Sequence, residues 1–190
     1  MCVSLRFIRL STNLEYIGVA AFRDCELTEA VFLPPTIISI GYEAFYQCKS
    51  LRFIKMPDAM DHIGFDVFQK CDLLSSTVRN NRDDNDLPMH KVCYSTSVNP
   101  QMINEYIDTH GIERGTEVND QQTTALHILC VNPHVTGDAI RAYLQLAAEA
   151  AEQQDSVGMT PFQYLCRNYI TFFDERNFSS MAAWWYGCMP

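Results

Sequence analysis

Apolar side chains recur with a period of 23 residues over the first 79 residues of the chain. Each unit has an isoleucine directly before a glycine, a phenylalanine four residues after that glycine and a cysteine three residues later. These positions are Ile17, Phe22 and Cys25, then Ile40, Phe45 and Cys48, then Ile63, Phe68 and Cys71. A fixed period of this length predicts a solenoid, in which each unit buries its apolar face against its neighbours.

Each 23-residue unit is predicted to begin with one short strand and to continue into a turn. In the third unit the strand covers residues 51–56 and is closed by Pro57, which cannot donate a hydrogen bond to a continuing sheet. Leu51, Ile54 and Met56 are expected to point inward. The glycine of each unit permits a turn or a close backbone approach that a side chain would block.

The repeated turn resembles the BspA-like class of leucine-rich repeats, whose unit continues as I-G-x-x-A-F-x-x-C. Residues 40–48 match this pattern at every key position, and Ala21-Phe22 keeps the Ala-Phe pair, whereas Val67 replaces the alanine. The resemblance covers residues 1 to about 78 and implies a right-handed solenoid with a short parallel sheet on its concave side. The first unit starts at its strand, so we expect the N-terminal cap to be missing. The pattern decays at Thr77 and Arg79.

A polar segment, residues 80–86, is predicted to be a linker before a second array with a longer period. Residues 87–93, 124–130 and 160–166 align with one another at spacings of 37 and 36 residues. Each block resembles the T-P-L-H signature that opens the first helix of an ankyrin repeat. In the third block Thr160 suits an N-cap and Pro161 suits the first helical position.

The second helices of this array are expected at residues 100–107 and from Thr136 or Asp138 onward. An aromatic tail, residues 169–190, is expected to supply the last helix and a terminal cap. The resemblance therefore implies about three ankyrin-like units over residues 87–190, with another class of helical solenoid as the alternative. The predicted fold is an α+β repeat protein, with a short parallel-β solenoid over residues 1–79 followed by an α-helical solenoid.

The net charge of −9 lies almost entirely in residues 80–190, the linker and the second array. Residues 80–190 carry 14 acidic and 6 basic side chains, which argues against binding of nucleic acid. No apolar run reaches the ~18 residues of a membrane span, and no signal peptide is visible, so we expect a cytoplasmic protein.

Six of the eight cysteines fall on the phase of the repeats: Cys25, Cys48, Cys71, Cys93, Cys130 and Cys166. A cysteine at one position of every unit behaves as a small buried apolar residue, with disulfides or metal binding as the alternatives. Cys2 and Cys188 lie off this phase and are expected to be the reactive thiols.

Two H-x-x-C pairs, His90 with Cys93 and His127 with Cys130, are the strongest candidates for a metal site. The third unit has Gln163 in place of histidine, and the cysteines are explained by the repeat, so we favour structural roles. The chain has no phosphate-binding glycine loop and no H-E-x-x-H or C-x-x-C motif. We therefore expect no catalytic, cofactor-binding or metal-binding residues.

The outward positions of the predicted strands combine cations with aromatics, as protein interfaces do. The proposed partner-binding residues on this concave face are Arg6, Arg9, Phe32, Arg52, Phe53 and Lys55. The alternative is that they are ordinary solvated strand residues. These features predict a non-catalytic protein–protein interaction module with an unidentified protein partner. The alternatives are a structural or cell-surface adhesion protein, which some BspA-like proteins are, and a metal-regulated switch.

Overall fold

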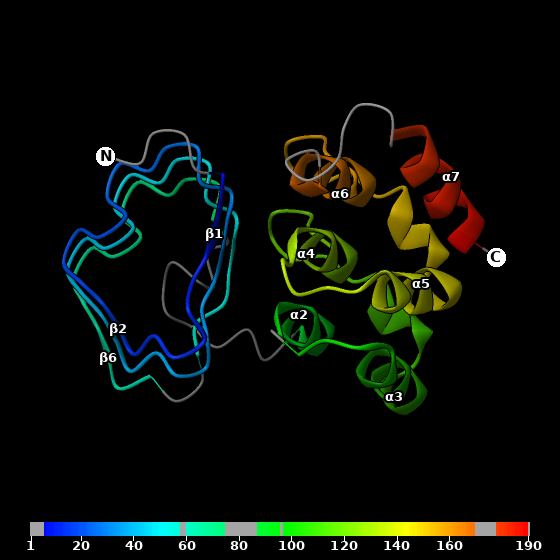
Figure 1. The fold of residues 1–190 in the computed structure, drawn as a ribbon, viewed down its shortest axis with the longest axis horizontal. Helices are drawn as coiled ribbons and strands as arrows, with labels where there is room; N and C mark the ends of the chain where they lie inside the picture. The colour runs from blue at the N-terminus through cyan, green and yellow to red at the C-terminus, as the bar shows by residue number, and fades with distance from the viewer. Residues whose placement is uncertain (1–5, 58–59, 75–86, 96, 170–177, 190) are drawn as a thin grey trace. The chain divides into compact units, whose positions relative to one another are not determined.

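The computed structural model of the chain describes residues 6–57, 60–74, 87–95, 97–169 and 178–189. The chain divides into two compact units, Met1–Asp84 and Asn85–Pro190, which we call unit 1 and unit 2 (Figure 1). The predicted linker at 80–86 lies outside the described residues, as do Thr77 and Arg79, where the repeat pattern decays.

Unit 1 is a coil in which two short parallel sheets run from repeat to repeat. The first sheet contains β1 (Phe7–Arg9), β3 (Ala30–Phe32) and β5 (Phe53–Ile54), and the second contains β2 (Tyr16–Ile17), β4 (Ser39–Ile40) and β6 (His62–Ile63). Every pairing joins residues 23 positions apart, such as Ile8 with Val31 and Ile17 with Ile40. The parallel strands predicted from the period are thereby confirmed.

The second sheet is an element that the sequence pattern did not predict. Its strands are two residues long, which is too short to show the alternation of apolar and polar positions that indicates a strand. The isoleucine of each Ile-Gly pair thus belongs to a strand and pairs with the isoleucine of the next repeat, although the pattern predicts a turn there.

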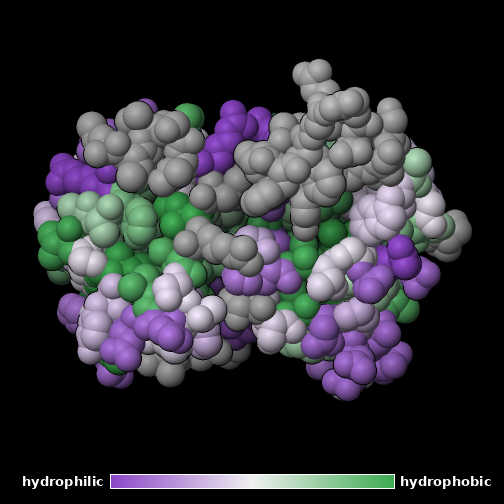
Figure 2. Space-filling view, viewed as in Figure 1, coloured by the Kyte–Doolittle hydropathy of each residue, from purple (hydrophilic) through white to green (hydrophobic). Residues whose placement is uncertain are grey.

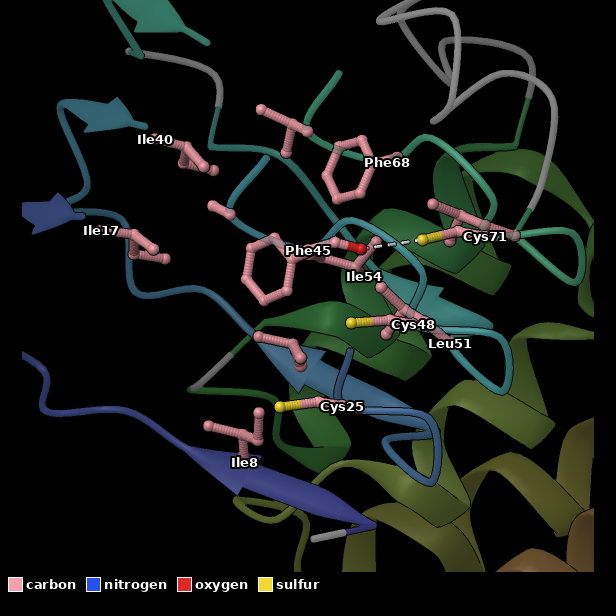
Figure 3. Close-up of a cluster of buried hydrophobic side chains, with 14 of the residues drawn as sticks. Ile8, Ile17, Cys25, Ile40, Phe45, Cys48, Leu51, Ile54, Phe68 and Cys71 are labelled. Carbon is pink, nitrogen blue, oxygen red and sulfur yellow. Dashed lines mark hydrogen bonds between the residues drawn. The ribbon is translucent and has the colours of Figure 1, made fainter. Parts of the chain in front are cut away.

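The core of unit 1 is built from the repeated apolar positions (Figure 3). The rings of Phe22, Phe45 and Phe68 form one stacked column, with centroids 5.2 and 5.8 Å apart. Cys48 donates a hydrogen bond from its thiol to the carbonyl of Phe22, and Cys71 donates to that of Phe45, each at 3.1 Å. One repeat is thus tied to the next by its cysteine as well as by its ring.

Unit 2 consists of helices in two layers (Figure 1). One layer contains α2 (Pro88–Tyr94), α4 (Ala125–Val131) and α6 (Pro161–Tyr169), and the other contains α3 (Pro100–His110), α5 (Gly137–Leu146) and α7 (Phe178–Cys188). Short 3-10 turns, η1 (Ile112–Gly115) and η2 (Ala148–Ala151), follow α3 and α5. The helices predicted to begin at Pro100 and near Thr136 are present, because Asn99 and Thr136 cap them.

Successive helix pairs of unit 2 are joined by repeated hydrogen bonds. The Nε2 atom of His90 lies 2.8 Å from the carbonyl oxygen of Thr123, and that of His127 lies 3.0 Å from the carbonyl of Met159. The side-chain amide of Asn132 donates to the carbonyl of Cys93 at 2.8 Å. The histidines of the two H-x-x-C pairs, His90 and His127, therefore bind backbone carbonyls that precede the next helix pair of unit 2.

Residues 178–188 of the aromatic tail form α7, which packs against α5 and α6. The ring centroid of Trp185 lies 5.1 Å from that of Phe162, and the side chain of Trp185 is buried. A Cβ atom on Gly137 would lie 3.3 Å from the Trp184 ring, so the glycine at the start of α5 permits the helices to approach closely.

Candidate interaction surface

The turns of unit 1, residues 17–25, 40–48 and 63–71, are held together by a ladder of backbone hydrogen bonds. Every second residue of one turn donates its N–H to a carbonyl 22 residues further along the chain. The pairs are Ala20 to Tyr42 (2.9 Å), Phe22 to Ala44 (2.8 Å), Asp24 to Tyr46 (2.9 Å), Glu43 to Phe65 (3.0 Å), Phe45 to Val67 (3.1 Å) and Gln47 to Gln69 (2.9 Å). The ladder gives the surface of the turns a fixed spacing.

Two positions of every turn have a left-handed backbone although none of them is glycine. They are Ala20, Glu43 and Asp66 at the first position and Asp24, Gln47 and Lys70 at the second, with φ between 52° and 62°. This conformation is unfavourable for residues with a side chain, by about 1–2 kcal/mol each. Because it recurs in all three repeats, the ladder and the stacked core must over-determine it.

The repeated glycine is required where one turn lies against the previous turn. A Cβ atom on Gly41 would come within 2.6 Å of the backbone nitrogen of Val19. A Cβ atom on Gly64 would collide in the same way with the backbone nitrogen of Tyr42. This close approach places the residue after each glycine directly beside its counterpart in the next repeat.

The residues after these glycines form a row of exposed apolar side chains, which we call the turn column. Val19, Tyr42 and Phe65 are 68%, 46% and 80% exposed, respectively. Neighbouring strands of a sheet lie about 4.8 Å apart, so three hydrophobic side chains follow one another closely on a rigid backbone. Single exposed apolar side chains are normal on a protein surface, whereas a cluster of them marks an interaction site. The turn column is therefore a candidate binding surface.

Charged and aromatic side chains connect the repeats beside the turn column. The guanidinium of Arg23 forms an ion pair with Glu43 and lies 4.8 Å from the centroid of the Tyr46 ring. Lys70 approaches the same ring to 5.2 Å. The hydroxyl of Tyr42 donates a hydrogen bond of 2.8 Å to Glu43, which raises the pKa of this tyrosine. The column is therefore bordered by cations held on an aromatic ring.

The predicted concave-face residues are only partly accessible. Arg6 is exposed and lies 3.9 Å from Glu29, and Lys55 is half-buried, whereas the side chain of Arg9 lies outside the described residues. The expectation that the aromatics of this face are exposed is wrong: Phe32 and Phe53 are 5% and 1% exposed. Arg52, whose guanidinium lies 5.9 Å from the Phe53 ring, is 7% exposed.

The sequence of the strands carries a signal for their burial. Ala30, Val31 and Phe32 form a continuous apolar run, and all three are buried. Runs of this kind are typical of parallel strands buried on both faces, whereas alternation is typical of strands with one solvated face. The sequence does not reveal the turn column in this way, because Val19, Tyr42 and Phe65 occupy one repeat position with three different residue types.

The six cysteines on the repeat phase are buried free thiols, as predicted. Burial raises the pKa of the Cys93 and Cys130 thiols, and the pKa of Cys48 is raised by a hydrogen bond with Cys71 and by burial. The expectation of a reactive Cys188 is wrong, because its place in α7 leaves it 4% exposed. Within the described residues, no three His, Cys, Asp or Glu side chains form a group that could hold a metal ion.

Comparison with known proteins supports the assignment of the first array. Residues 1–87 match the family model described as a BspA type leucine rich repeat region, in six copies. No curated protein and no solved structure matches the chain. Among the helices that the structure describes, none is both long enough and apolar enough to cross a membrane. The match favours a protein-interaction or surface module for the repeats.

Proposed function

We propose that the chain is a non-catalytic protein–protein interaction module and that its turn column binds the partner. The observation that carries the proposal is the exposure of one large apolar side chain at the same position of three successive repeats. A partner with a complementary apolar groove would bury Val19, Tyr42 and Phe65 together. Leucine-rich repeats commonly serve such a role, because a solenoid presents an extended surface on a rigid backbone.

The composition of the turn column suits a binding hot spot. Such sites are enriched in aromatic residues and arginine, and a few of them account for most of the binding free energy. The hydrogen-bond ladder and the ion pair between Arg23 and Glu43 hold the backbone of the turns in place before binding, so little conformational entropy is lost on association. Fixed geometry of this kind favours recognition over catalysis, in keeping with a scaffold.

The concave face remains a second proposed surface, with Arg6 and Lys55 as its accessible members. Their charge would select an acidic partner surface, and their contribution would weaken with salt. Phe32, Arg52 and Phe53 belong to the same proposed set but are buried in this structure, so we rank the concave face below the turn column.

For unit 2, the repeating features support ankyrin-like units. Thr124 and His127 form a reciprocal cap at the start of α4, and Thr160 with Gln163 repeats the arrangement at α6. The carboxylate of Asp155 accepts hydrogen bonds from two backbone N–H groups of the turn before α6. The seven described cysteines are free thiols, which fits our proposal of a reducing, cytoplasmic environment.

The proposal is tested by affinity capture from native lysate with matched baits. We expect the double variant Tyr42→Ser, Phe65→Ser to lose the main partner by roughly 30-fold or more, as truncation of a hot spot by 2 kcal/mol or more implies. Tyr186→Ser changes an aromatic of unit 2 that is 65% exposed, between the values of Tyr42 and Phe65, and should leave capture unchanged. A third bait with Arg6→Ala and Lys55→Ala measures the concave face. Full capture by the turn-column variant would contradict the proposal.

A further inference from the structure

The exposed side chains of the turn column follow one another at nearly the pitch of an α-helix. Unit 1 shows hydrophobic residues between hydrophilic ones on its surface (Figure 2), and three of its exposed apolar side chains form the turn column. The phenylalanine rings of the same three turns have centroids 5.2 and 5.8 Å apart, and the backbone ladder extends this repeat to the outward positions. An α-helix rises about 5.4 Å per turn. A helix that lies along the column therefore places one side chain of every helical turn beside one column side chain of every repeat.

Extended segments match this spacing less well than a helix does. Side chains on one face of a β-strand are about 6.7 Å apart, and those of a polyproline segment repeat every 9.3 Å or so. Over the three side chains of the turn column the mismatch grows to about 2 Å for a strand and about 8 Å for polyproline, against less than about 0.5 Å for a helix. The spacing of the turn column therefore favours a helical ligand.

The backbone of the middle turn is already engaged by the ladder. The N–H groups of Glu43 and Phe45 donate to the third turn, and the carbonyls of Tyr42 and Ala44 accept from the first. An extended segment laid across these turns would bury backbone N–H and C=O groups that need partners of their own. A helix satisfies its backbone groups internally, so burial against an apolar surface costs it less free energy.

The accessible charge on one flank of the turn column is positive. Arg23 and Lys70 are exposed and lie over the same aromatic ring, at 4.8 and 5.2 Å from its centroid. The carboxylates of this flank are less accessible, because Glu43 is buried and Asp24 and Asp66 are half-buried. A partner that covers the column therefore meets mainly the two cations, and the complementary charge on the partner is acidic.

We propose that the turn column binds an amphipathic α-helix of the protein partner, which lies along the column and crosses the three turns. The proposal rests on the proposed function, because it names the kind of partner segment that covers Val19, Tyr42 and Phe65. The helix carries apolar residues at positions i, i+3 or i+4, and i+7. Acidic residues of the helix lie on the side that faces Arg23 and Lys70.

Selection from a display library of random peptides, each of about 16 residues or roughly four helical turns, tests the proposal on the full chain. Peptides are enriched on the wild type and counter-selected on the double variant Tyr42→Ser, Phe65→Ser, whose folding is checked by thermal unfolding. We expect the retained peptides to have apolar residues at helical spacing and to bind the double variant roughly 30-fold more weakly. Column-dependent peptides with apolar residues at every second position, or rich in proline, would overturn the helix but leave the binding site standing. A selection without any column-dependent peptide would overturn both the helix and the proposed function.

Changes in a selected peptide and in the protein test the helix and its charged side separately. A proline at a central, solvent-facing position of the peptide should weaken binding by roughly 100-fold relative to alanine there, because it breaks the helix without removing a contact. Lys70→Glu should weaken binding severalfold at low salt, whereas Lys91→Glu, the same change in unit 2, should leave it unaltered. Equal binding of the proline and alanine peptides would overturn the helix, and equal binding by Lys70→Glu and the wild type would overturn its acidic side.

Discussion

At the scale of single residues, the turns of unit 1 show two separate demands on the backbone. The glycines at 41 and 64 are required by close approach of the neighbouring turn, whereas the left-handed positions carry ordinary residues. The requirement for glycine can be predicted from the sequence, because glycine recurs every 23 residues. The left-handed positions cannot be predicted in this way, because Ala20, Glu43 and Asp66 share no chemical feature. Only the structure shows that they share a backbone conformation.

A pair of alanine-to-glycine substitutions tests the left-handed conformation. Ala20→Gly should stabilise the protein by about 0.5–1 kcal/mol, because glycine removes the steric penalty of the left-handed backbone. Ala142→Gly, within α5, should destabilise it by about 1 kcal/mol through the loss of helix propensity. Urea unfolding measures both changes. A destabilisation by Ala20→Gly equal to that of the control would show that this residue is not strained.

The buried thiols predict how stability depends on pH. Burial raises the pKa of Cys93 and Cys130, so the folded protein keeps protons that the unfolded chain releases above a pKa of about 8.5. The stabilisation is therefore complete below this pH and is lost above it, by about 1.4 kcal/mol per pH unit for each protected thiol.

Urea unfolding at several pH values between about 7 and 9.5 measures this loss of stability, since the range brackets the thiol pKa of the unfolded chain. The variant Cys93→Ala should be less stable at neutral pH but should lose stability less steeply as the pH rises, by the contribution of one thiol. An equal slope for both proteins would mean that Cys93 ionises as readily in the folded state as in the unfolded state.

At the scale of elements, two helices of unit 2 begin at capping threonines, of which Thr160 is predicted from the sequence. Thr124 and Thr160 stand directly before α4 and α6, and the side chains three positions later, His127 and Gln163, accept hydrogen bonds from their backbone N–H groups. Such pairs are local, so the sequence predicts them well. The link from His127 to the Met159 carbonyl joins residues 32 positions apart and depends on how the helix pairs stack. That link required the structure.

Variants of His127 separate the cap from the link between repeats. The Nδ1 atom accepts from the N–H of Thr124 at 3.1 Å, and Nε2 therefore donates to Met159. His127→Ala should destabilise the protein by roughly 2–4 kcal/mol, because it removes both bonds and leaves a buried cavity. His127→Gln should recover part of this loss, since Gln163 forms the equivalent cap at 2.8 Å. Equal losses for both variants, measured by chemical unfolding, would show that the cap does not contribute.

At the scale of the whole molecule, the sequence could predict a parallel-strand repeat followed by a helical region, but not which faces of these parts would be exposed. The period located the parallel strands, the ring column and the buried cysteines, because these positions recur with the same chemistry. Exposure depends on what covers the outward positions, and a periodic pattern of inward residues carries no information about this. Phe53 and Phe65 are both outward-facing phenylalanines of the third repeat, yet one is buried and the other is 80% exposed.

Hydroxyl-radical footprinting of the protein, alone and with its captured partner, tests the interaction-module account most directly. Tyr42 and Phe65 are exposed and react readily with hydroxyl radicals as aromatic side chains, and Tyr186 of unit 2 serves as an internal reference. The account predicts that the partner lowers the oxidation of Tyr42 and Phe65 severalfold and leaves Tyr186 unchanged. Unaltered oxidation of both turn-column residues in a saturated complex, with protection confined to unit 2, would contradict it.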